Sequence, residues 1–299
     1  MARSIFYKIR RRGQVAALKL TSPEFVSKIY FKHLLKYSLN LKNPKTFNEK
    51  IQWLKLYEWP NNPIAIKCGD KYTVREYIEE KGLGEYLNEL LFVWESVDDI
   101  DWDKLPEQFA LKCTHGCGYN IICEDKSKLD ISAAKKQLKM WMKEDFGLFN
   151  AEPHYSKMKP RIICEKFLGG EITDYKFYCF HGKVEFMYVA YGFGHGINET
   201  IAFFDKDGNK APYKRTDYPV FEEATLPENF EKMKELSEIL CKDVPFVRVD
   251  WFEENGRVYF GELTYTPCGG LMKIEPIEYD TIWGNMLDIS GEIKAYGKK

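Results

Sequence analysis

The chain has 299 residues, of which 44% are hydrophobic and 15% aromatic, and its formal net charge is −1 at pH 7. The length is enough for two domains or for one domain with a large core, and the composition excludes an intrinsically disordered chain. With a net charge so close to zero, the protein has no overall field that would attract nucleic acid, so we expect no nucleic-acid partner.

The sequence indicates a cytoplasmic protein. Its apolar runs fall short of the roughly 20 residues that cross a bilayer, and the first residues lack the continuous apolar core of a signal peptide. The eight cysteines are scattered and form no C-x-x-C pair, which fits reduced structural thiols. Cys113, His115 and Cys117 have a C-x-H-x-C spacing, but a metal site would need a second pair of ligands.

The N-terminus is basic, since the run KIRRR at residues 8–12 follows Ile5, Phe6 and Tyr7. A solvated tail is the commoner explanation of such a run. Weak peripheral contact with an anionic membrane is the alternative, because neighbouring basic and apolar side chains suit a bilayer surface.

Helices are expected first along the chain. Apolar spacing and the T-x-x-E capping pattern of Thr46 and Glu49 predict mainly helical structure over residues 21–59. A further helix, with its own T-x-x-E pattern near its start, is expected over residues 72–81 and ends at Gly82.

The rest of the chain mixes strands, hairpins and helices. The predicted elements are a strand at 90–97, a hairpin at 109–123, a helix at 131–144, a strand at 161–168, a hairpin at 174–192, a helix at 230–241 and a hairpin at 247–267. Helices interleave with hairpins, so we predict an α+β fold with antiparallel sheets.

The last hairpin carries Arg248, Asp250 and Glu262 among apolar and aromatic residues. Two carboxylates on adjacent strands repel each other unless a cation lies between them, and Mg²⁺ is a natural guest because it prefers oxygen ligands. The plainer alternative is a cross-strand ion pair between Arg248 and Glu262, with Asp250 at a solvated edge.

The loop of this hairpin decides which side chains share a face, because successive residues of a strand point to opposite faces. A two-residue loop at 255–256 would put the two carboxylates on opposite faces. We predict a three-residue loop at 254–256, in which Asp250 pairs with Phe260 and the arginine, both carboxylates and Thr264 lie on one face.

Two lysines lie in places that suit phosphate groups. Lys112 precedes the Gly-x-Gly turn of Gly116 and Gly118, whose backbone N–H groups could close over phosphates. An ordinary tight turn has the same sequence pattern. Lys71 lies in GDK at a helix start, where a phosphate would offset the unfavourable charge, although a solvated lysine is commoner.

Two further stretches place polar residues in strands. ICEKFLGG puts Glu165 in an apolar strand, on the same face as Phe167, beside backbone groups that could bind an adenine edge, although a plain core strand has the same pattern. In DYKFYCF, Asp174 and Lys176 alternate outwards, which alone indicates only a polar face.

The order of the motifs along the chain resembles that of the ATP-grasp superfamily. The motifs are GDK, ALKCTHGCG, CEKFL, DYKFY and RVDWF with GELTYTP. The chain resembles biotin carboxylases in having GDK, then a strand lysine before a glycine loop, then an EKYL-type hinge. It resembles D-alanine–D-alanine ligases in having RVD followed by ELTYTPCGG. More closely, the chain resembles the TupA-like ATP-grasp family, which is named for teichuronopeptide biosynthesis. The matching stretches are TFNEKIQWLKLY, DKYTVREYI, LPEQFALKCTHGCGYNIIC, PRIICEKFL and DYKFYCFHGKVEF. The resemblance spans roughly Pro44 to Gly284.

The resemblance implies ATP and Mg²⁺ as cofactors and assigns roles to residues of this chain. Lys71 and Lys112 would hold the α- and β-phosphates, and His115, Gly116 and Gly118 would form the loop over the phosphates. Adenine would bind at the hinge of Glu165, Lys166, Phe167 and Leu168, near Lys176. The metal ligands would be Asp250, Glu262 and Thr264, with Arg248 facing the γ-phosphate. The chain departs from the superfamily at Thr264, where asparagine is frequent, and in its short glycine loop with Cys117 between the glycines.

The resemblance also implies a domain division and a reaction. The expected parts are a mainly helical N-terminal region at 1–67, a central subdomain with the glycine loop at 68–168 and a C-terminal subdomain with the metal site at 169–299. The expected reaction joins a carboxylate to an amine through an acyl phosphate, with ADP and phosphate as products. The expected partners are a small-molecule or polysaccharide carboxylate acceptor and an amino-acid amine.

Three other functions remain alternatives. A glycosyltransferase of surface polysaccharide assembly would use a DxD motif, which DID and DWD at residues 99–103 match, although that acidic stretch is more typical of a solvated loop. A kinase on the same fold would phosphorylate a hydroxyl, and a scaffold would bind nucleotide without catalysis. The substrate wall has five candidates that the sequence does not rank: Trp141, Tyr155, Arg161, Tyr191 and Arg215.

Overall fold

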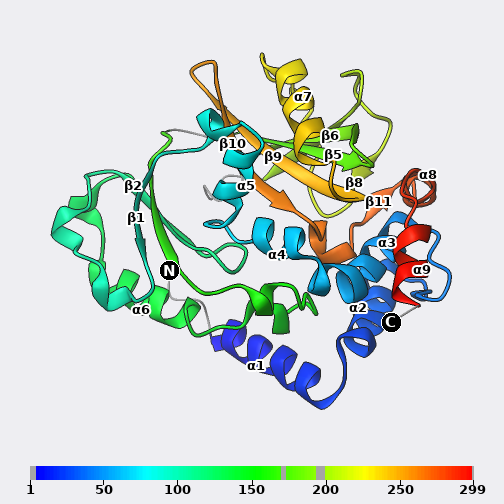
Figure 1. Ribbon diagram of the computed structural model, residues 1–299, viewed down its shortest axis with the longest axis horizontal. Helices are drawn as coiled ribbons and strands as arrows, with labels where there is room; N and C mark the ends of the chain where they lie inside the picture. Colours follow the sequence, from blue (N-terminus) through cyan, green and yellow to red (C-terminus); the bar gives the residue numbers. More distant parts are fainter. Residues whose placement is uncertain (1–4, 170–172, 193–198, 298–299) are drawn as a thin grey trace.

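The computed structural model describes residues 5–169, 173–192 and 199–297. Two antiparallel sheets carry most of the strands, and helices from both ends of the chain gather beside the larger sheet (Figure 1). The α+β class with antiparallel sheets is therefore confirmed. The helices are α1 (Ile5–Leu20), α2 (Pro23–Leu35), α3 (Phe47–Trp53), α4 (Pro63–Gly69), α5 (Val74–Glu80), α6 (Ile131–Trp141), α7 (Phe230–Leu240), α8 (Glu278–Met286) and α9 (Ser290–Tyr296).

The smaller sheet has four strands in the order β1-β4-β2-β3. One face of it packs on α6, and the shared core includes Leu111, Cys164, Leu138 and Trp141. The β2–β3 hairpin and its glycine turn were expected from the sequence and are confirmed. Its strands are β1 (Leu90–Trp94), β2 (Phe109–Cys113), β3 (Asn120–Cys123) and β4 (Ile162–Lys166).

The larger sheet has five strands in the order β10-β9-β5-β6-β7, and β8 pairs with β11 beside it. The His-Gly turn between β5 and β6 was expected and is confirmed, since His181 and Gly182 have φ values of 48° and 82°. The strands are β5 (Asp174–Phe180), β6 (Lys183–Tyr191), β7 (Thr200–Asp205), β8 (Lys214–Arg215), β9 (Phe246–Glu254), β10 (Arg257–Thr264) and β11 (Ile274–Glu275).

Alternation along β5 and β9 gives the larger sheet one apolar face and one mixed face. On the apolar face the Phe177 ring stacks on Phe230 of α7, and the Trp251 indole N–H donates to Ser237 of α7 at 2.7 Å. Part of the opposite face is covered by α3, whose Phe47 ring lies 5.3 Å from that of Phe246. The uncovered part of that face carries the polar cluster described below.

The N-terminal region is less helical than expected, because residues 36–46 form no helix between α2 and α3. The expected capping box at the start of α3 is confirmed. Thr46 accepts from the Glu49 N–H at 3.2 Å, and the Glu49 carboxylate accepts from the Thr46 N–H at 3.1 Å. The π-helical turn Leu54–Glu58 continues α3.

The start of α5 differs from the T-x-x-E expectation. Thr73 makes no capping bond with its side chain and instead donates to Lys67 O at 2.6 Å. The carboxylate of Asp70 accepts from the N–H groups of Tyr72 at 2.8 Å and Thr73 at 3.0 Å. An aspartate that fixes the turn before the helix therefore takes the role that we expected of Thr73 and Glu76. The helix ends as expected at Gly82, whose φ is 74°.

The hydrophobic cores do not follow the expected division at residue 67. One cluster joins Phe31, Phe47 and Trp59 of the N-terminal region with the larger sheet, and another belongs to the smaller sheet. The buried Asn48 side chain donates to Met272 O at 3.0 Å and accepts from its N–H at 2.8 Å. The three-part division stays a prediction, but the N-terminal helices share their core with the C-terminal part.

Candidate active site

The β9–β10 hairpin has a two-residue loop, so the three-residue loop predicted from the sequence is wrong. Asn255 and Gly256 have φ values of 52° and 74°, and the flanking residues Glu254 and Arg257 pair directly. Positive φ at both loop positions is the type I′ turn that Asn-Gly prefers, because its twist matches that of the strands.

A β-bulge at Gly261 restores the expected common face. Phe260 pairs with Trp251, but the next pair is Glu262 with Asp250, so the register shifts by one residue. A Cβ at position 261 would lie 2.9 Å from Asp250 O, closer than a side chain can approach. The bulge therefore requires glycine, and it carries Glu262 to the face of Asp250.

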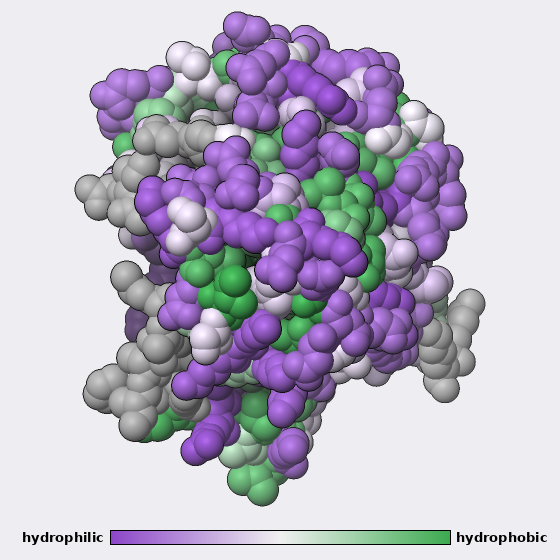
Figure 2. Space-filling model, turned by 90° about the vertical axis from the view of Figure 1, so that its left-hand side faces the viewer, coloured by the Kyte–Doolittle hydropathy of each residue, from purple (hydrophilic) through white to green (hydrophobic). Residues whose placement is uncertain are grey.

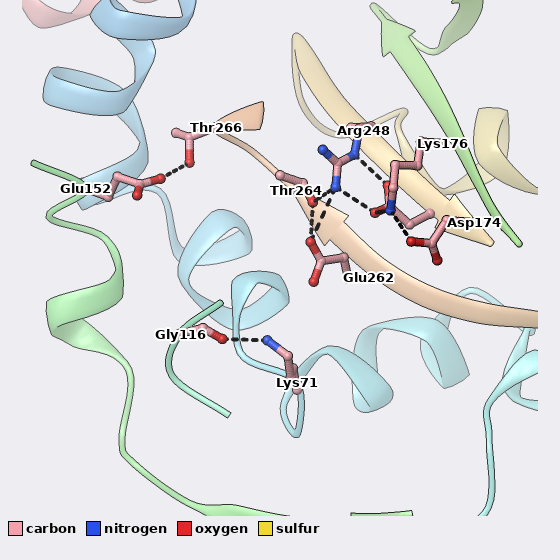
Figure 3. A network of polar contacts seen from close by, with 10 residues as sticks. Lys71, Gly116, Glu152, Asp174, Lys176, Arg248, Glu262, Thr264 and Thr266 are labelled. Atoms are coloured by element: carbon pink, nitrogen blue, oxygen red, sulfur yellow. Dashed lines mark hydrogen bonds and ion pairs between the residues drawn. The ribbon is translucent and has the colours of Figure 1, made fainter. Parts of the chain in front are cut away.

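Arg248 is the centre of the cluster on this face (Figure 3). Its guanidinium donates twice to Asp250, with Nε–Oδ1 and Nη2–Oδ2 distances of 2.6 Å. Nη2 also lies 2.9 Å from Thr264 Oγ1 and 3.5 Å from Glu262 Oε1. The predicted gathering of these four residues on one face is confirmed, although the pairs differ, since Arg248 lies opposite Thr264 rather than Glu262.

Lys176 of β5 adds a second cation to the cluster. Its Nζ lies 2.7 Å from Asp250 Oδ2 and 3.1 Å from Asp174 Oδ2. Burial alone would lower the pKa of Lys176, but the carboxylates of Asp174 and Asp250 raise it above its ordinary value. Lys176 therefore stays charged, and sequence reasoning missed that Asp174 takes part.

Glu262 is the carboxylate most open to a ligand. Its side chain is 38% exposed, whereas that of Asp250 is 2% exposed. Burial by the surrounding protein would raise the pKa of Glu262, but the charges of Lys71 and Arg248 lower it to about 2. Thr264 donates to Oε1 at 2.6 Å, so Glu262 is a fixed, ionised carboxylate at neutral pH.

The oxygen atoms of this cluster are the kind of donor that Mg²⁺ prefers. Both oxygens of Asp250 accept from Arg248 or Lys176, while Glu262 accepts from Thr264 and Arg248 through Oε1. Among the described residues the acidic, histidine and cysteine side chains form no ready group of three or more metal ligands. The donor set fits Mg²⁺ in kind, with Glu262 exposed and both oxygens of Asp250 engaged by Lys176 and Arg248.

Lys71 holds the glycine loop in place (Figure 3). Its Nζ donates to Gly116 O at 2.7 Å, and its backbone N–H donates to Thr114 O. Asp70, which sequence reasoning did not single out, ties the same two segments together, because its Oδ2 accepts from the Thr114 hydroxyl at 2.9 Å. The charge of Lys71 also contributes to the lowered pKa of Glu262.

In the glycine loop, the two glycines shape the backbone, whereas the His115 side chain is buried. A Cβ at Gly116 would lie 2.7 Å from the Tyr119 ring, so this position requires glycine, and Gly118 has a φ of 70°. The His115 ring is buried, and its Nε2 lies 3.1 Å from Trp141 O. Only the backbone of His115 can therefore take the role over phosphates that the resemblance implies.

Lys112 and Glu165 form a second polar group on the smaller sheet. Lys112 Nζ lies 2.7 Å from Glu165 Oε2, and Arg75 Nη1 lies 3.3 Å from Glu165 Oε1. Arg75 also donates to Asn88 O at 2.7 Å. The Glu165 carboxylate is thus held by two cations. Sequence reasoning missed Arg75, because its helix lies 90 residues before Glu165 in the sequence.

The expected adenine hinge continues from β4 toward the larger sheet. Lys166 is tied to the neighbouring segment, since its O accepts from the Asn88 side chain at 2.8 Å and its N–H donates to Glu89 O at 3.0 Å. Phe167 and Leu168 follow and are half-buried. A cavity of about 530 Å³ lined by Lys166, Phe167 and Gln108 lies at this end of the smaller sheet and does not include the hairpin cluster.

Arg215 is a substrate-wall candidate that the structure fixes by an ion pair with Asp217. Its Nε and Nη2 lie 2.9 and 2.5 Å from the Asp217 carboxylate, and it is 7% exposed. The charges of both Arg215 and Arg248 act on Cys268, so two guanidiniums lie near the turn Pro267–Gly270. Trp141, by contrast, is buried in the core of the smaller sheet.

A buried network that the sequence did not reveal supports the same turn (Figure 3). Thr266 donates to the buried carboxylate of Glu152, and Lys55 Nζ donates to Gly269 O at 3.1 Å. Burial lowers the pKa of Lys55 to about 8, although Glu152 opposes the shift. The one signal in the sequence was a lysine within the apolar helical run WLKLY.

The chain was compared with protein families and known proteins. The model of a family described as TupA-like ATPgrasp matches residues 49–288, while a search of curated proteins finds no match. Similar solved structures include D-alanine–D-alanine ligase from Bacillus anthracis complexed with ATP, with 15% identity over 78% of this chain and 68% of that chain and a TM-score of 0.43. L-Amino acid ligase from Bacillus licheniformis gives 14% identity over 81% of this chain and 55% of that chain, with a TM-score of 0.46.

Proposed function

We propose that this chain, which belongs to the TupA-like ATP-grasp family, is an ATP- and Mg²⁺-dependent carboxylate–amine ligase. The acceptor would be a uronate or amino-acid carboxylate of a cell-surface polysaccharide or its precursor, and the amine that of an amino acid. The reaction would take place in the cytoplasm, where ATP is supplied. The observation that carries the proposal is the buried Arg248–Asp250–Lys176 cluster with the half-exposed carboxylate of Glu262 at its edge.

The proposed mechanism begins with the γ-phosphate of ATP held between the two sheets. Lys71 and Lys112 bind phosphate oxygens from the side of the glycine loop, and Arg248 and Lys176 do so from the larger sheet. The acceptor carboxylate attacks the γ-phosphate, and these cations stabilise the charge spread over the transferring group. The amine then attacks the acyl carbon, releases phosphate and forms the amide.

Glu262 and Thr264, with Asp250 as a further carboxylate, would hold Mg²⁺ by their oxygen atoms. The metal ion would supply charge neutralisation between the phosphates. The protein supplies a fixed carboxylate, since the low pKa of Glu262 keeps it ionised.

The cysteines near the site support direct transfer to a bound carboxylate. Cys117 and Cys268 both reach the surface, but the surrounding protein raises the pKa of each thiol. A thiol with a raised pKa is a weak nucleophile at neutral pH, so a thioester route has little support.

The acceptor carboxylate would bind beside Arg215. Its guanidinium shares only one edge with Asp217, and the hydroxyl of the buried Tyr178 has no hydrogen-bond partner in the described part of the chain. Tyr178 of β5 pairs with Arg248 of β9, so its side chain lies next to that of Arg248 on the sheet.

A glycosyltransferase has less support from the geometry. In the DxD stretch, Asp101 accepts from the Asp103 N–H at 3.2 Å and lies 3.0 Å from Lys104, so it caps an exposed turn. The kinase alternative shares the nucleotide site and differs only in the acceptor group.

The experiment uses Mg-ATP, glucuronate labelled with ¹⁸O in its carboxylate, and a mixture of amino acids, followed by ³¹P NMR. A ligase transfers one ¹⁸O from the acceptor to phosphate, which identifies the acyl phosphate, and forms ADP only when acceptor and amine are both present. A new phosphate ester identifies a kinase instead. Failure of the protein to bind Mg-ATP by calorimetry contradicts both.

A further inference from the structure

The charge of the protein is distributed very unevenly. Residues 9–36 carry seven basic residues and one acidic residue, a formal charge of +6, whereas the whole chain carries −1. The remaining residues together therefore carry −7. Helices α1 and α2 make up nearly all of this basic segment.

One face of α1 is exposed and carries apolar residues between basic ones. Ile9 and Leu20 are 60% and 84% exposed, and with Gly13 and Ala16 they recur at the spacing of a single helical stripe. At 100° per residue, Arg12 and Lys19 fall on one side of this stripe and Arg10 on the other, and all three are exposed.

The exposed stripe is not the face that holds α1 on the protein. Leu18 is buried with Val26 of α2 and with Ala151. The guanidinium of Arg11 lies 3.7 Å from the centre of the Phe149 ring. The helix thus packs on the protein through one side and presents a second apolar side to the surroundings.

Helix α2 extends the same pattern. Phe25 and Ile29 are 52% and 50% exposed, and Lys32 and Lys36 continue the exposed face at helical spacing. Lys28 is exposed too, although it pairs with Glu24 at 2.6 Å. Figure 1 shows α1 along the lower edge of the molecule, and Figure 2 shows hydrophobic surface at that lower end among hydrophilic atoms.

We propose that the exposed faces of α1 and α2 dock on an anionic bilayer surface. The docking surface comprises the apolar side chains of Ile9, Leu20, Phe25 and Ile29 and the basic side chains of Arg10, Arg12, Lys19, Lys32 and Lys36. The apolar side chains enter the boundary between headgroups and acyl chains, and the basic ones bind lipid phosphates. The contact is peripheral, since no described helix is long and apolar enough to cross the membrane.

The chemistry of this surface favours lipid over nucleic acid. A nucleic-acid surface uses basic side chains with aromatic platforms on which bases stack. Here three of the four exposed apolar side chains are aliphatic, and they would stay in water against a phosphate backbone. The inference does not depend on the ligase proposal, because it uses none of the residues of the hairpin cluster.

The test is flotation of the full chain with vesicles. We expect binding to phosphatidylcholine vesicles that contain about 30% phosphatidylglycerol, loss of binding at high salt, and no binding to pure phosphatidylcholine. The triple variant L20S/F25S/I29S should bind about tenfold less, and R10E/R12E/K19E should not bind. The matched control I277S/I282S/M286S removes apolar side chains that are 54%, 41% and 41% exposed elsewhere and should bind as the wild type does.

Circular dichroism and gel filtration check that each variant is folded. No flotation with anionic vesicles at low salt would overturn the inference, and so would equal binding by all variants. Binding of a single-stranded RNA oligomer that is lost in R10E/R12E/K19E and that anionic vesicles do not displace would show that the surface serves nucleic acid instead.

Discussion

Glu262 combines three properties that single it out among the acidic residues of the site. It is ionised well below neutral pH, its Oε1 is fixed by Thr264, and its side chain is 38% exposed. A carboxylate that is charged, oriented and reachable can hold a metal–phosphate complex. The more deeply buried Asp250 instead orients Arg248 and Lys176.

Glu262→Gln should therefore lower kcat about 100-fold or more while leaving the fold intact, because it removes the charge and keeps the shape. Steady-state ADP formation and thermal unfolding measure the two effects. The matched control is Glu231→Gln on the exposed side of α7, which should change neither. Full activity of the Glu262→Gln variant, with acceptor and amine dependence retained, would exclude the metal role of this residue.

Lys112→Ala should weaken ATP binding by about tenfold to a hundredfold, as expected for loss of a charge-assisted contact to phosphate. The fold should tolerate the change, because Arg75 still pairs with Glu165 at 3.3 Å. Isothermal titration with a non-hydrolysable ATP analogue gives the affinity. Lys128→Ala, at a side chain that is 82% exposed, is the control. An unchanged Kd would remove Lys112 from the phosphate site.

At the scale of elements, the last hairpin shows what local reasoning can and cannot find. The Asn-Gly turn, the two strands and the shared face of the polar residues could all be predicted. The three-residue loop was wrong because Gly261 was taken as an ordinary strand residue, whereas it forms a bulge that moves the register. A glycine inside a strand pattern was the available signal.

The bulge gives a prediction at this scale. Gly261→Ala should destabilise the protein by about 2 kcal/mol, because the new Cβ would meet backbone and ring atoms that are fixed by the sheet. It should also reduce activity, since Glu262 would lose its place beside Asp250. Chemical denaturation and ADP formation are the measurements. Gly291→Ala is a suitable control because a Cβ there would meet nothing within 4 Å.

Contacts between elements that are far apart along the chain could not be predicted from the sequence. Lys176 and Asp250 are 74 residues apart, and Glu152 and Thr266 are 114 residues apart. Such pairs depend on which strands become neighbours and on how helices pack over them, and local propensity carries neither. The glycine loop, Lys71 and Lys112, and the hairpin carboxylates could be singled out because each lies beside a recognisable turn or strand.

At the scale of the whole molecule, the site depends on segments from all three parts of the chain. The helices of the N-terminal region bury Lys55 and Asn48 against the turn Pro267–Gly270 and Met272, which follow the hairpin. The loop that contains Glu152 and His154 lies between them and is buried too. Loss of packing among the N-terminal helices and this loop would therefore disturb the candidate active site and lower the stability of the fold at the same time.

His154 makes that stability depend on pH. Burial, aided by the charge of Lys55, lowers the pKa of His154 to about 3, and its Nδ1 has no hydrogen-bond partner in the described part of the chain. Between pH 6.5 and 3 the unfolded chain binds a proton that the native protein does not bind. Stability is therefore lost as pH falls through this range, by about 2 kcal/mol at pH 5.

The wild type alone does not isolate this effect, because burial raises the pKa values of Glu152 and Asp174, and those shifts stabilise the native protein as pH falls. The measurement is the difference in unfolding free energy between wild type and His154→Phe, followed by urea denaturation from pH 7.5 to 5. We expect the variant to gain on the wild type by about 2 kcal/mol across that range, whatever its stability at pH 7.5. Parallel curves would mean that the native protein protonates His154 as readily as the unfolded chain does, which its burial beside Lys55 opposes.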